Sequence, residues 1–200
     1  LITTGRTVSR VRRMGNDTMG QWSYQILSGT NKQEILVIKV YQCCHSSNDN
    51  PDSLTAHHQQ KIMLSEENRK ALPCIQFKRD LISFIQKEKL HNGNIVPILM
   101  GDWNDTDTKL SAKTMLYQEF SLVDIFDRNF SDHKKFWTYN RGRRRLDYVL
   151  APPWVADSVE RIVYEPFMYR LKGDHRGFYF DISEDKLFWN VMENPYDPEH

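Results

Sequence analysis

The chain has 200 residues, a formal net charge of +1 and a hydrophobic fraction of 40%. This length fits one globular domain with a sizeable core, and the near-zero net charge gives no attraction of the whole molecule to a polyanion. Three cysteines are too few for a disulfide framework, and no apolar run reaches the roughly 18 residues that a membrane helix needs. Composition therefore excludes a disulfide-stabilised secreted scaffold and a protein with membrane-spanning helices, and we expect an intracellular protein of the nucleus or cytoplasm.

Two strands joined by a tight turn are predicted near the start of the chain. Residues 20–27 alternate apolar or aromatic with polar side chains, residues 28–32 are typical of a turn, and residues 34–41 form a second apolar run. This pattern predicts a hairpin, with Tyr41 at the end of its second strand. Residues 7–11 show only weak alternation and predict no definite element.

Two helices are expected after a polar loop at residues 43–53. Ser53 or Thr55 is placed to cap the first helix, which runs through Leu64. The apolar residues of the second helix recur at positions i, i+4, i+7 and i+8: Phe77, Leu81, Phe84 and Ile85. That spacing predicts an amphipathic helix, which ends near residues 91–94.

The rest of the chain is dominated by apolar runs of strand length. Residues 95–100 predict a buried strand, and residues 111–117 predict a short helix. Four further strands are expected, at residues 136–139, 145–150, 159–167 and 178–182. Many strands with a few helices between them indicate an α/β layered sandwich. We expect one domain over residues 1–190 and a flexible tail over residues 191–200, which contain two prolines.

Acidic and amide side chains follow the buried strand in the middle of the chain. Asp102 and Asn104 are two positions apart, so in an extended segment they share a face and can project together from the end of the strand. A carboxylate and an amide at such a place can hold a hard divalent cation, or a phosphate and its attacking water. Two more acidic segments come later, one around Asp147 and one at the pair Asp174 and His175.

Each of these segments also has an ordinary structural explanation. The Asp-x-Asn segment suits the exit from a strand into a turn, and the Asp-His pair suits a surface loop. Asp147, in an apolar strand, could be the buried ion-pair partner of an arginine in the run 143–145. Trp137 and Tyr139 are expected in the core, with stacking on a base or sugar as the alternative. The occurrence of all three acidic segments in one chain is what favours a functional site.

The three segments resemble, in order, the motifs of a known superfamily. Residues 101–104 read GDWN, residues 145–150 read RLDYVL and residues 173–176 read GDHR, where the endonuclease/exonuclease/phosphatase superfamily usually has GDFN, RIDYI and SDH. Residues 138–142, TYNRG, are most similar to the endonuclease domains that accompany reverse transcriptases. The resemblance runs from about residue 20 to residue 182.

This resemblance implies a DNase I-like fold, in which helices flank a sandwich of two mainly antiparallel β-sheets. It also implies that the domain is incomplete at its N-terminus, because the family's first strands bring an Asn and then a metal-binding Glu. Neither of these motifs is found before residue 20.

The activity that the resemblance implies is in-line attack of water on a phosphodiester, assisted by Mg²⁺ or Mn²⁺. His175 would act as a base or stabilise the charge of the phosphate, because an imidazole exchanges protons at neutral pH. Asp147 would orient a ring nitrogen of His175. Asp174 would orient His175 or hold the metal.

The other implied roles concern the attacking water and the phosphate. Asp102 would position the water or accept its proton, and Asn104 would hold the phosphate. Tyr41, whose strand resembles the family's strand that closes in Ala-Tyr, would contact the transferring phosphate. Four arginines precede Asp147 closely enough to grip backbone phosphates at the rim of a cleft: Arg141, Arg143, Arg144 and Arg145.

We therefore expect a metal-dependent phosphodiester hydrolase, most directly an endonuclease on DNA, that works as a monomer and is fused to or encoded beside a reverse transcriptase. Two alternatives stay open. One is a phosphomonoesterase or lipid-headgroup phosphodiesterase of the same fold, against which the arginine cluster and the TYNRG segment argue mildly. The other is a catalytically inactive remnant or binding module, which the missing N-terminal motifs favour.

Overall fold

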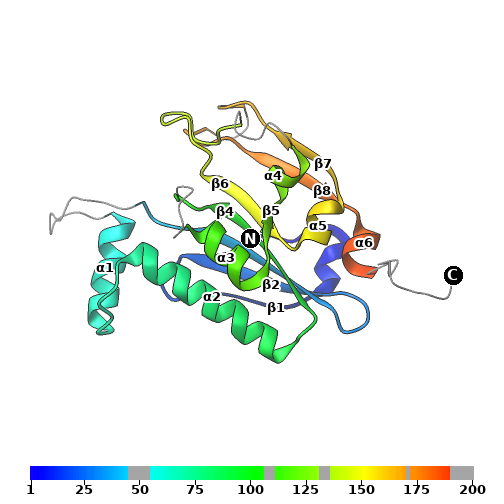
Figure 1. Ribbon diagram of the computed structural model, residues 1–200, viewed down its shortest axis with the longest axis horizontal. Helices are drawn as coiled ribbons and strands as arrows, with labels where there is room; N and C mark the ends of the chain where they lie inside the picture. Colours follow the sequence, from blue (N-terminus) through cyan, green and yellow to red (C-terminus); the bar gives the residue numbers. More distant parts are fainter. Residues whose placement is uncertain (45–54, 106–110, 131–135, 170–171, 190–200) are drawn as a thin grey trace.

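A mixed six-stranded β-sheet forms the middle of the molecule (Figure 1). The computed structural model describes residues 1–44, 55–105, 111–130, 136–169 and 172–189. In spatial order the strands are β1 (Val11–Asn16), β2 (Trp22–Ser28), β3 (Glu34–Tyr41), β4 (Ile95–Asp102), β6 (Asp147–Ala151) and β5 (Val123–Asp124). Neighbouring strands pair antiparallel, except β3 and β4, which are parallel.

Helices and a two-stranded antiparallel sheet complete the fold. The second sheet consists of β7 (Val159–Tyr164) and β8 (Phe178–Ile182). The helices are the 3₁₀ helix η1 (Gly5–Arg10), α1 (Ala56–Glu66), α2 (Pro73–His91), α3 (Ala112–Phe120), α4 (Ile125–Asn129), α5 (Pro153–Asp157) and α6 (Glu184–Trp189). Among the described residues, none of these helices combines the length and the apolar character that crossing a membrane requires.

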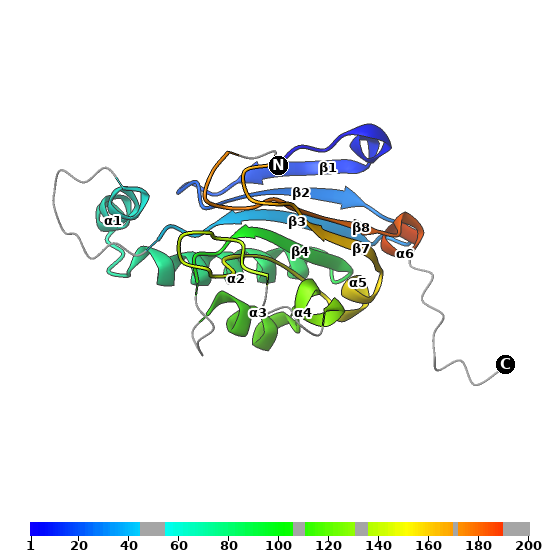
Figure 2. The same cartoon turned by 90° about the horizontal axis from the view of Figure 1, so that it is seen from above.

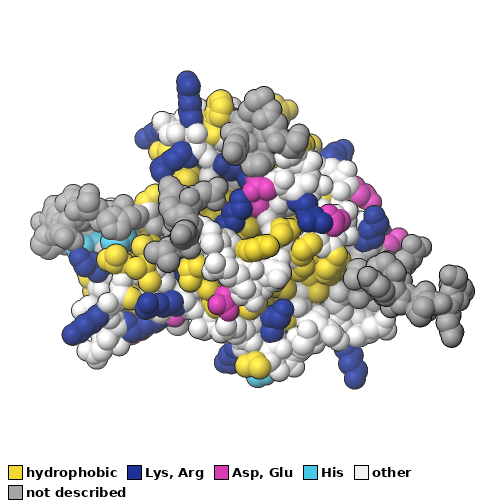
Figure 3. Space-filling model, viewed as in Figure 1, with side chains coloured by type: hydrophobic (Ala, Val, Ile, Leu, Met, Phe, Trp, Pro, Cys, Tyr) yellow, Lys and Arg dark blue, Asp and Glu magenta, His cyan; other side chains and the backbone are white. Residues whose placement is uncertain are grey.

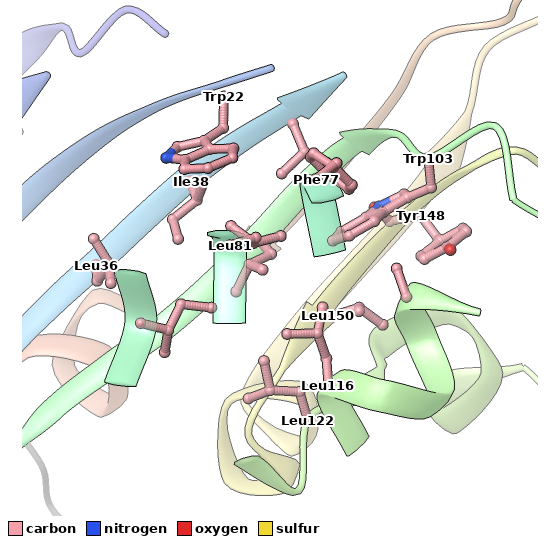
Figure 4. Close-up of a cluster of buried hydrophobic side chains, with 14 of the residues drawn as sticks. Trp22, Leu36, Ile38, Phe77, Leu81, Trp103, Leu116, Leu122, Tyr148 and Leu150 are labelled. Atoms are coloured by element: carbon pink, nitrogen blue, oxygen red, sulfur yellow. The ribbon is translucent and has the colours of Figure 1, made fainter. Parts of the chain in front are cut away.

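Helix α2 covers one face of the six-stranded sheet because its apolar residues recur every four positions. Phe77, Leu81 and Ile85 are almost completely buried along one stripe of this helix. They pack against inward side chains of four strands: Trp22, Leu36, Ile38, Leu99 and Leu150. Figure 4 shows this cluster in close-up, with Trp22, Ile38 and Leu150 among the labelled side chains. Burying a side chain of this size contributes about 1.5–3 kcal/mol, so this layer is a main source of stability.

The opposite face of the large sheet carries a second apolar cluster. Alternation along the strands turns Ile35, Ile98 and Val149 to this side. The short helices α4 and α5 add Phe126 and Val155, and β7 and β8 add partly buried residues. In Figure 2, α2 and α3 lie along one side of β4, whereas β7 and β8 run together nearer the viewer. The fold is therefore layered, with helices on one face of the sheet and the second sheet and short helices on the other.

Strand register brings distant parts of the chain to one end of the large sheet. Parallel pairing of β3 with β4 puts Tyr41 beside Asp102, and antiparallel pairing of β4 with β6 puts Asp102 opposite Asp147. The segment before β8 adds His175, whose backbone forms a bridge with Tyr139. The ends of β3 and β4 and the start of β6 therefore meet where His175 lies.

Most of the predicted elements are confirmed. The strands β2, β3, β4, β6, β7 and β8 and the helices α1, α2 and α3 coincide with predicted segments to within a few residues. Thr55 and Ser111 cap α1 and α3, because their side chains accept hydrogen bonds from the backbone N–H groups of His58 and Thr114. The predicted loop at residues 43–53 lies mostly outside the described residues, and the predicted tail at residues 191–200 lies wholly outside them.

The strand predicted at residues 136–139 is wrong. Within it the structure has only an isolated bridge at Tyr139, because this segment contacts both Arg144 and His175 instead of extending along one partner. Strand β1 carries no sequence signal, since four of its six residues are exposed and it is held by pairing with β2. The short helices α5 and α6 are also absent from the prediction.

Candidate active site

Gly101 lets β4 approach β3 closely just before Asp102. Its φ is 144°, a conformation that L side chains rarely adopt, and an added Cβ would overlap the carbonyl oxygen of Val40. Only glycine fits here without displacing the β3 backbone. Gly101 thereby fixes the end of β4, and with it the position of Asp102.

Trp103 and Asn104 hold the Asp102 segment from two sides. Trp103 is fully buried, and its indole Nε1 donates to the carbonyl oxygen of Tyr148 at 3.1 Å. Asn104 has a left-handed backbone with φ 43°, and its backbone N–H and side-chain amide donate to the Asp102 carboxylate at 3.1 and 2.9 Å. The same amide nitrogen donates to the carbonyl oxygen of Gln42 at 2.9 Å. These bonds leave the Asp102 carboxylate little freedom to rotate.

Thr138 is missing from the residues predicted for the site, yet it ties two of its segments together. Its hydroxyl accepts hydrogen bonds from the backbone N–H groups of Leu146 and Asp147, at 2.9 and 3.0 Å. Its carbonyl oxygen accepts from the N–H of Arg176 at 2.9 Å, and the side chain is completely buried. Since Arg176 follows His175, Thr138 fixes Asp147 relative to His175. The one sequence signal for it was its place at the head of the TYNRG segment.

His175 lies between two carboxylates. Its Nδ1 atom is 2.8 Å from Oδ2 of Asp147, and its Nε2 atom is 4.0 Å from Oδ2 of Asp102. The ring of Tyr139 lies beside it, with the two ring centroids 5.1 Å apart. The structure therefore brings together three residues that the sequence places 28 to 73 positions apart, together with Asn104.

Burial and charge raise the pKa of all three titratable groups. Burial raises the pKa of Asp102 to about 6, and the charge of Asp147 adds to this effect. Burial also raises the pKa of Asp147, against the hydrogen bonds from His175 and Thr138. Burial lowers the pKa of His175, but the hydrogen bond and charge of Asp147 and the charge of Asp102 outweigh it, so the net pKa is raised. The group can therefore hold and exchange a proton near neutral pH.

The same three side chains offer a site for a metal ion. Among the described residues, ligand atoms of Asp102, Asp147 and His175 lie within 4.8 Å of one another. Two carboxylates and one imidazole fit a divalent cation such as Mg²⁺ or Mn²⁺, and its positive charge would oppose the burial and the Asp147 charge that raise the pKa of Asp102. Asp174, the predicted metal ligand, lies outside this group, and its Oδ2 is 3.3 Å from Nε of Arg141.

Tyr41 reaches the edge of the group from the end of β3. It is 41% exposed and lies beside Asp102 in the parallel register of β3 and β4. Burial and the charges of Cys44 and Asp102 raise the pKa of Tyr41. Its hydroxyl therefore stays protonated at neutral pH and can donate a hydrogen bond.

Three of the four arginines predicted to grip phosphates are exposed: Arg141, Arg143 and Arg144. They belong to the loop before β6, drawn yellow-green in Figure 1, and basic side chains stand out from the surface over this part of the molecule in Figure 3. Arg145 instead points inward and pairs with Asp124 and Asp127, each at 2.6 Å. The predicted phosphate contact of Arg145 is therefore wrong. The alternative that Asp147 pairs with one of these arginines is also wrong, because its partner is His175.

Comparison with known proteins finds similar folds among solved structures, but no match among family models or curated proteins. A scan against protein-family models gave no match, and a search of curated proteins gave none either. Among solved structures, the chain is similar to the 3'-5' exonuclease NExo from Neisseria meningitidis, with 18% identity and a TM-score of 0.54 over 86% of this chain and 70% of that chain.

Two further structures show the same similarity. The AP endonuclease LMAP from Leishmania major matches with 16% identity and a TM-score of 0.53, over 82% of this chain and 55% of that chain. The catalytic domain of human Nocturnin matches with 12% identity and a TM-score of 0.51, over 86% of this chain and 60% of that chain. The chain thus has the fold of the endonuclease/exonuclease/phosphatase superfamily, and the DNase I-like layered α/β fold predicted from the sequence is confirmed.

Proposed function

We propose that this protein is a divalent-metal-dependent phosphodiester hydrolase that acts as an endonuclease on DNA. The observation that carries the proposal is the imidazole of His175 between two carboxylates, 2.8 Å from Asp147 and 4.0 Å from Asp102. The names of two similar structures, a 3'-5' exonuclease and an AP endonuclease, support the same class of substrate.

In the proposed reaction, His175 and Asp102 position the attacking water and accept its proton. Asp147 accepts a hydrogen bond from Nδ1 of His175, which fixes the tautomer and leaves Nε2 to accept or hold a proton on the side of Asp102. Asp102 lies on this side of the imidazole, where its carboxylate positions the water or accepts its proton.

Asn104 acts first as a positioning residue for Asp102. Its side-chain amide donates both to the Asp102 carboxylate and to the carbonyl oxygen of Gln42. Its predicted contact with the phosphate requires the amide to exchange one of these bonds for a phosphate oxygen, which costs little because a charged acceptor replaces a neutral carbonyl.

A metal ion at this site would be held by the carboxylates of Asp102 and Asp147. When bound, Mg²⁺ or Mn²⁺ stabilises the negative charge that develops on the phosphate. Asp174 precedes His175 and pairs with Arg141, which suits its predicted alternative role of orienting the imidazole segment. Metal ligation by Asp174 stays a prediction.

The exposed loop before β6 supports a polynucleotide substrate. Tyr41 can donate to the transferring phosphate, and the exposed arginines of the loop can contact phosphates around it: Arg141, Arg143 and Arg144. The TYNRG segment of this loop supports a closer relation to the endonuclease domains that accompany reverse transcriptases. We propose that residues 1–190 form one such domain and that it works as a monomer.

The substrate class is tested by three assays of the same preparation, each with Mg²⁺ and with EDTA. They measure nicking of supercoiled plasmid DNA, release of phosphate from an oligonucleotide with a 3'-phosphate, and release of phosphate from a soluble inositol phosphate. The proposal predicts nicked plasmid with Mg²⁺ and intact plasmid with EDTA. Phosphate release without nicking would favour the phosphomonoesterase alternative, and no hydrolysis of any substrate would favour an inactive remnant.

A further inference from the structure

One half-buried arginine next to His175 has no carboxylate partner. The described part of the chain has four half-buried arginines, and three of them form ion pairs. These pairs are Arg10–Glu184, Arg69–Asp80 and Arg145–Asp124. The fourth, Arg176, pairs with no carboxylate of the described residues, and its Nε atom is buried without a hydrogen-bond partner. A buried guanidinium N–H without an acceptor has a cost, so its retention here needs an explanation.

Two aromatic rings lie beside the Arg176 guanidinium, and a second arginine lies near one of these rings. Its Cζ atom lies 4.1 Å from the ring centroid of Phe167 and 5.9 Å from that of Trp137. The Cζ atom of Arg143 lies 6.0 Å from the same Trp137 ring. Cation–π contacts offset part of the cost of burying Nε, but they supply no acceptor for its N–H. An anion between or beside the two guanidinium groups would stabilise both.

Backbone hydrogen bonds fix this cluster relative to the reactive imidazole. Arg176 follows His175, and its N–H donates to the carbonyl oxygen of Thr138, whose hydroxyl accepts from the N–H of Asp147. Trp137 directly precedes Thr138. The backbone of Arg176 is therefore fixed beside that of His175, and this is the basis for placing an anion bound by its guanidinium near the scissile phosphate.

We propose that Arg176, together with Arg143 over the Trp137 ring, forms a subsite for a phosphate that flanks the scissile phosphate of a polynucleotide. A guanidinium offers planar, bidentate hydrogen bonds that match phosphate oxygens. Arg141 and Arg144 of the same loop are exposed and extend the basic surface. They can contact further phosphates along a polynucleotide backbone. This inference rests on the proposed function and narrows it, since a substrate with a single phosphate cannot fill both places.

The test measures binding without cleavage. A fluorescein-labelled duplex oligonucleotide is titrated in EDTA at several salt concentrations, with the wild-type chain, Arg176→Gln and Arg143→Gln. Each variant is expected to bind about fivefold to tenfold more weakly and to show a smaller salt dependence, by about one phosphate contact. Arg161→Gln is the matched control, because Arg161 is exposed and pairs with Asp181 on the second sheet. It should bind like the wild type.

A second variant separates binding from folding. Arg176→Lys keeps the charge and a long apolar stem but loses the planar fork, so it should weaken binding by about twofold to fivefold with an unchanged salt dependence. If thermal unfolding shows that Arg176→Gln is not folded, the oligonucleotide affinity of Arg176→Lys is the result that tests the proposal. Wild-type affinity in the folded Arg176 variants would overturn the proposal, and so would an equal loss in Arg161→Gln.

Two further arms identify the source of the phosphate and separate this inference from the proposed function. If Arg176→Gln weakens binding of inositol hexakisphosphate but not of the oligonucleotide, the polynucleotide assignment is wrong. Binding that depends on Arg176 in a wild-type chain that cleaves nothing would support the subsite and refute the hydrolase. Cleavage by the wild-type chain with full oligonucleotide affinity in Arg176→Gln would support the hydrolase and refute the subsite.

Discussion

The Nδ1 atom of His175 lies 2.8 Å from Oδ2 of Asp147, across 28 positions of the sequence. This bond orients the imidazole and raises its pKa. Asp147→Asn should therefore lower the pKa of His175 and reduce the rate of plasmid nicking by about 100-fold or more. NMR titration of the His175 ring and single-turnover cleavage check the two effects. An unchanged pKa together with a normal rate would show that the pair has no part in the reaction.

The pKa of Asp102, about 6, makes stability depend on pH. Because this pKa is raised above the usual value for aspartate, the protonated form favours the folded state, and that stabilisation is lost as the pH rises through about 6. The raised pKa of His175 acts in the same direction. Asp102→Asn should thus raise the free energy of unfolding at pH 8 by roughly 1–3 kcal/mol, with a smaller gain at pH 5.

Urea unfolding at the two pH values checks this, with Asp157→Asn as the control. The hydrogen bond from Arg128 lowers the pKa of Asp157, so its carboxylate contributes stability at pH 8 and the control variant should be slightly less stable there. A gain for Asp102→Asn that is equal at both pH values would refute the role of its raised pKa.

Metal binding should stabilise the wild-type chain through Asp102 and Asp147. Mg²⁺ or Mn²⁺ at about 100 times its dissociation constant adds about 2.7 kcal/mol to the free energy of unfolding, and EDTA should remove this gain. Asp102→Asn should lose most of it, whereas Asp174→Asn should keep it, because Asp174 lies outside the donor group. Differential scanning fluorimetry measures the shift. Loss of the shift in Asp174→Asn would show that Asp174 is the ligand, as the sequence predicts.

Arg145 should matter for stability because its partner is deeply buried. Asp124 is 3% exposed, and Arg145→Met would leave its carboxylate without this ion pair. The expected loss is about 3–5 kcal/mol in the free energy of unfolding. Arg144→Gln, at an exposed neighbouring position, should unfold like the wild type. Chemical denaturation of the two variants checks this, and equal stabilities would rule out a structural role for the Arg145 pair.

The site segments could be found from the sequence because each is local. GDWN, RLDYVL and GDHR each place an acidic residue at the end of an apolar strand or in the loop before one, and the strand pattern gives the position. The close approach of β3 at Gly101 is also indicated by the sequence, since a glycine at the end of a buried strand often marks a place where another backbone comes near. Whether these segments meet in the folded chain depends on how the strands pair and in which register. The local sequence pattern does not determine that pairing.

The errors concern partners that are distant in sequence. Arg144 and Arg145 are adjacent in a basic run, yet one is exposed and the other pairs with Asp124, 21 positions earlier. The hydroxyl of Thr138 accepts from backbone N–H groups, and such bonds require no particular side chain on the donor residue. The aromatic segment at residues 136–139 looked like a strand because its composition suits one, whereas tertiary contacts decide its conformation.

The central claim is that the imidazole between two carboxylates performs phosphodiester hydrolysis. Its most direct test is the rate of plasmid nicking in Mg²⁺ by the wild-type chain and by His175→Ala, with His91→Ala at the exposed end of α2 as the control. We predict a fall of at least about 100-fold for His175→Ala and a wild-type rate for His91→Ala. Equal rates for the wild-type chain and His175→Ala would contradict the account.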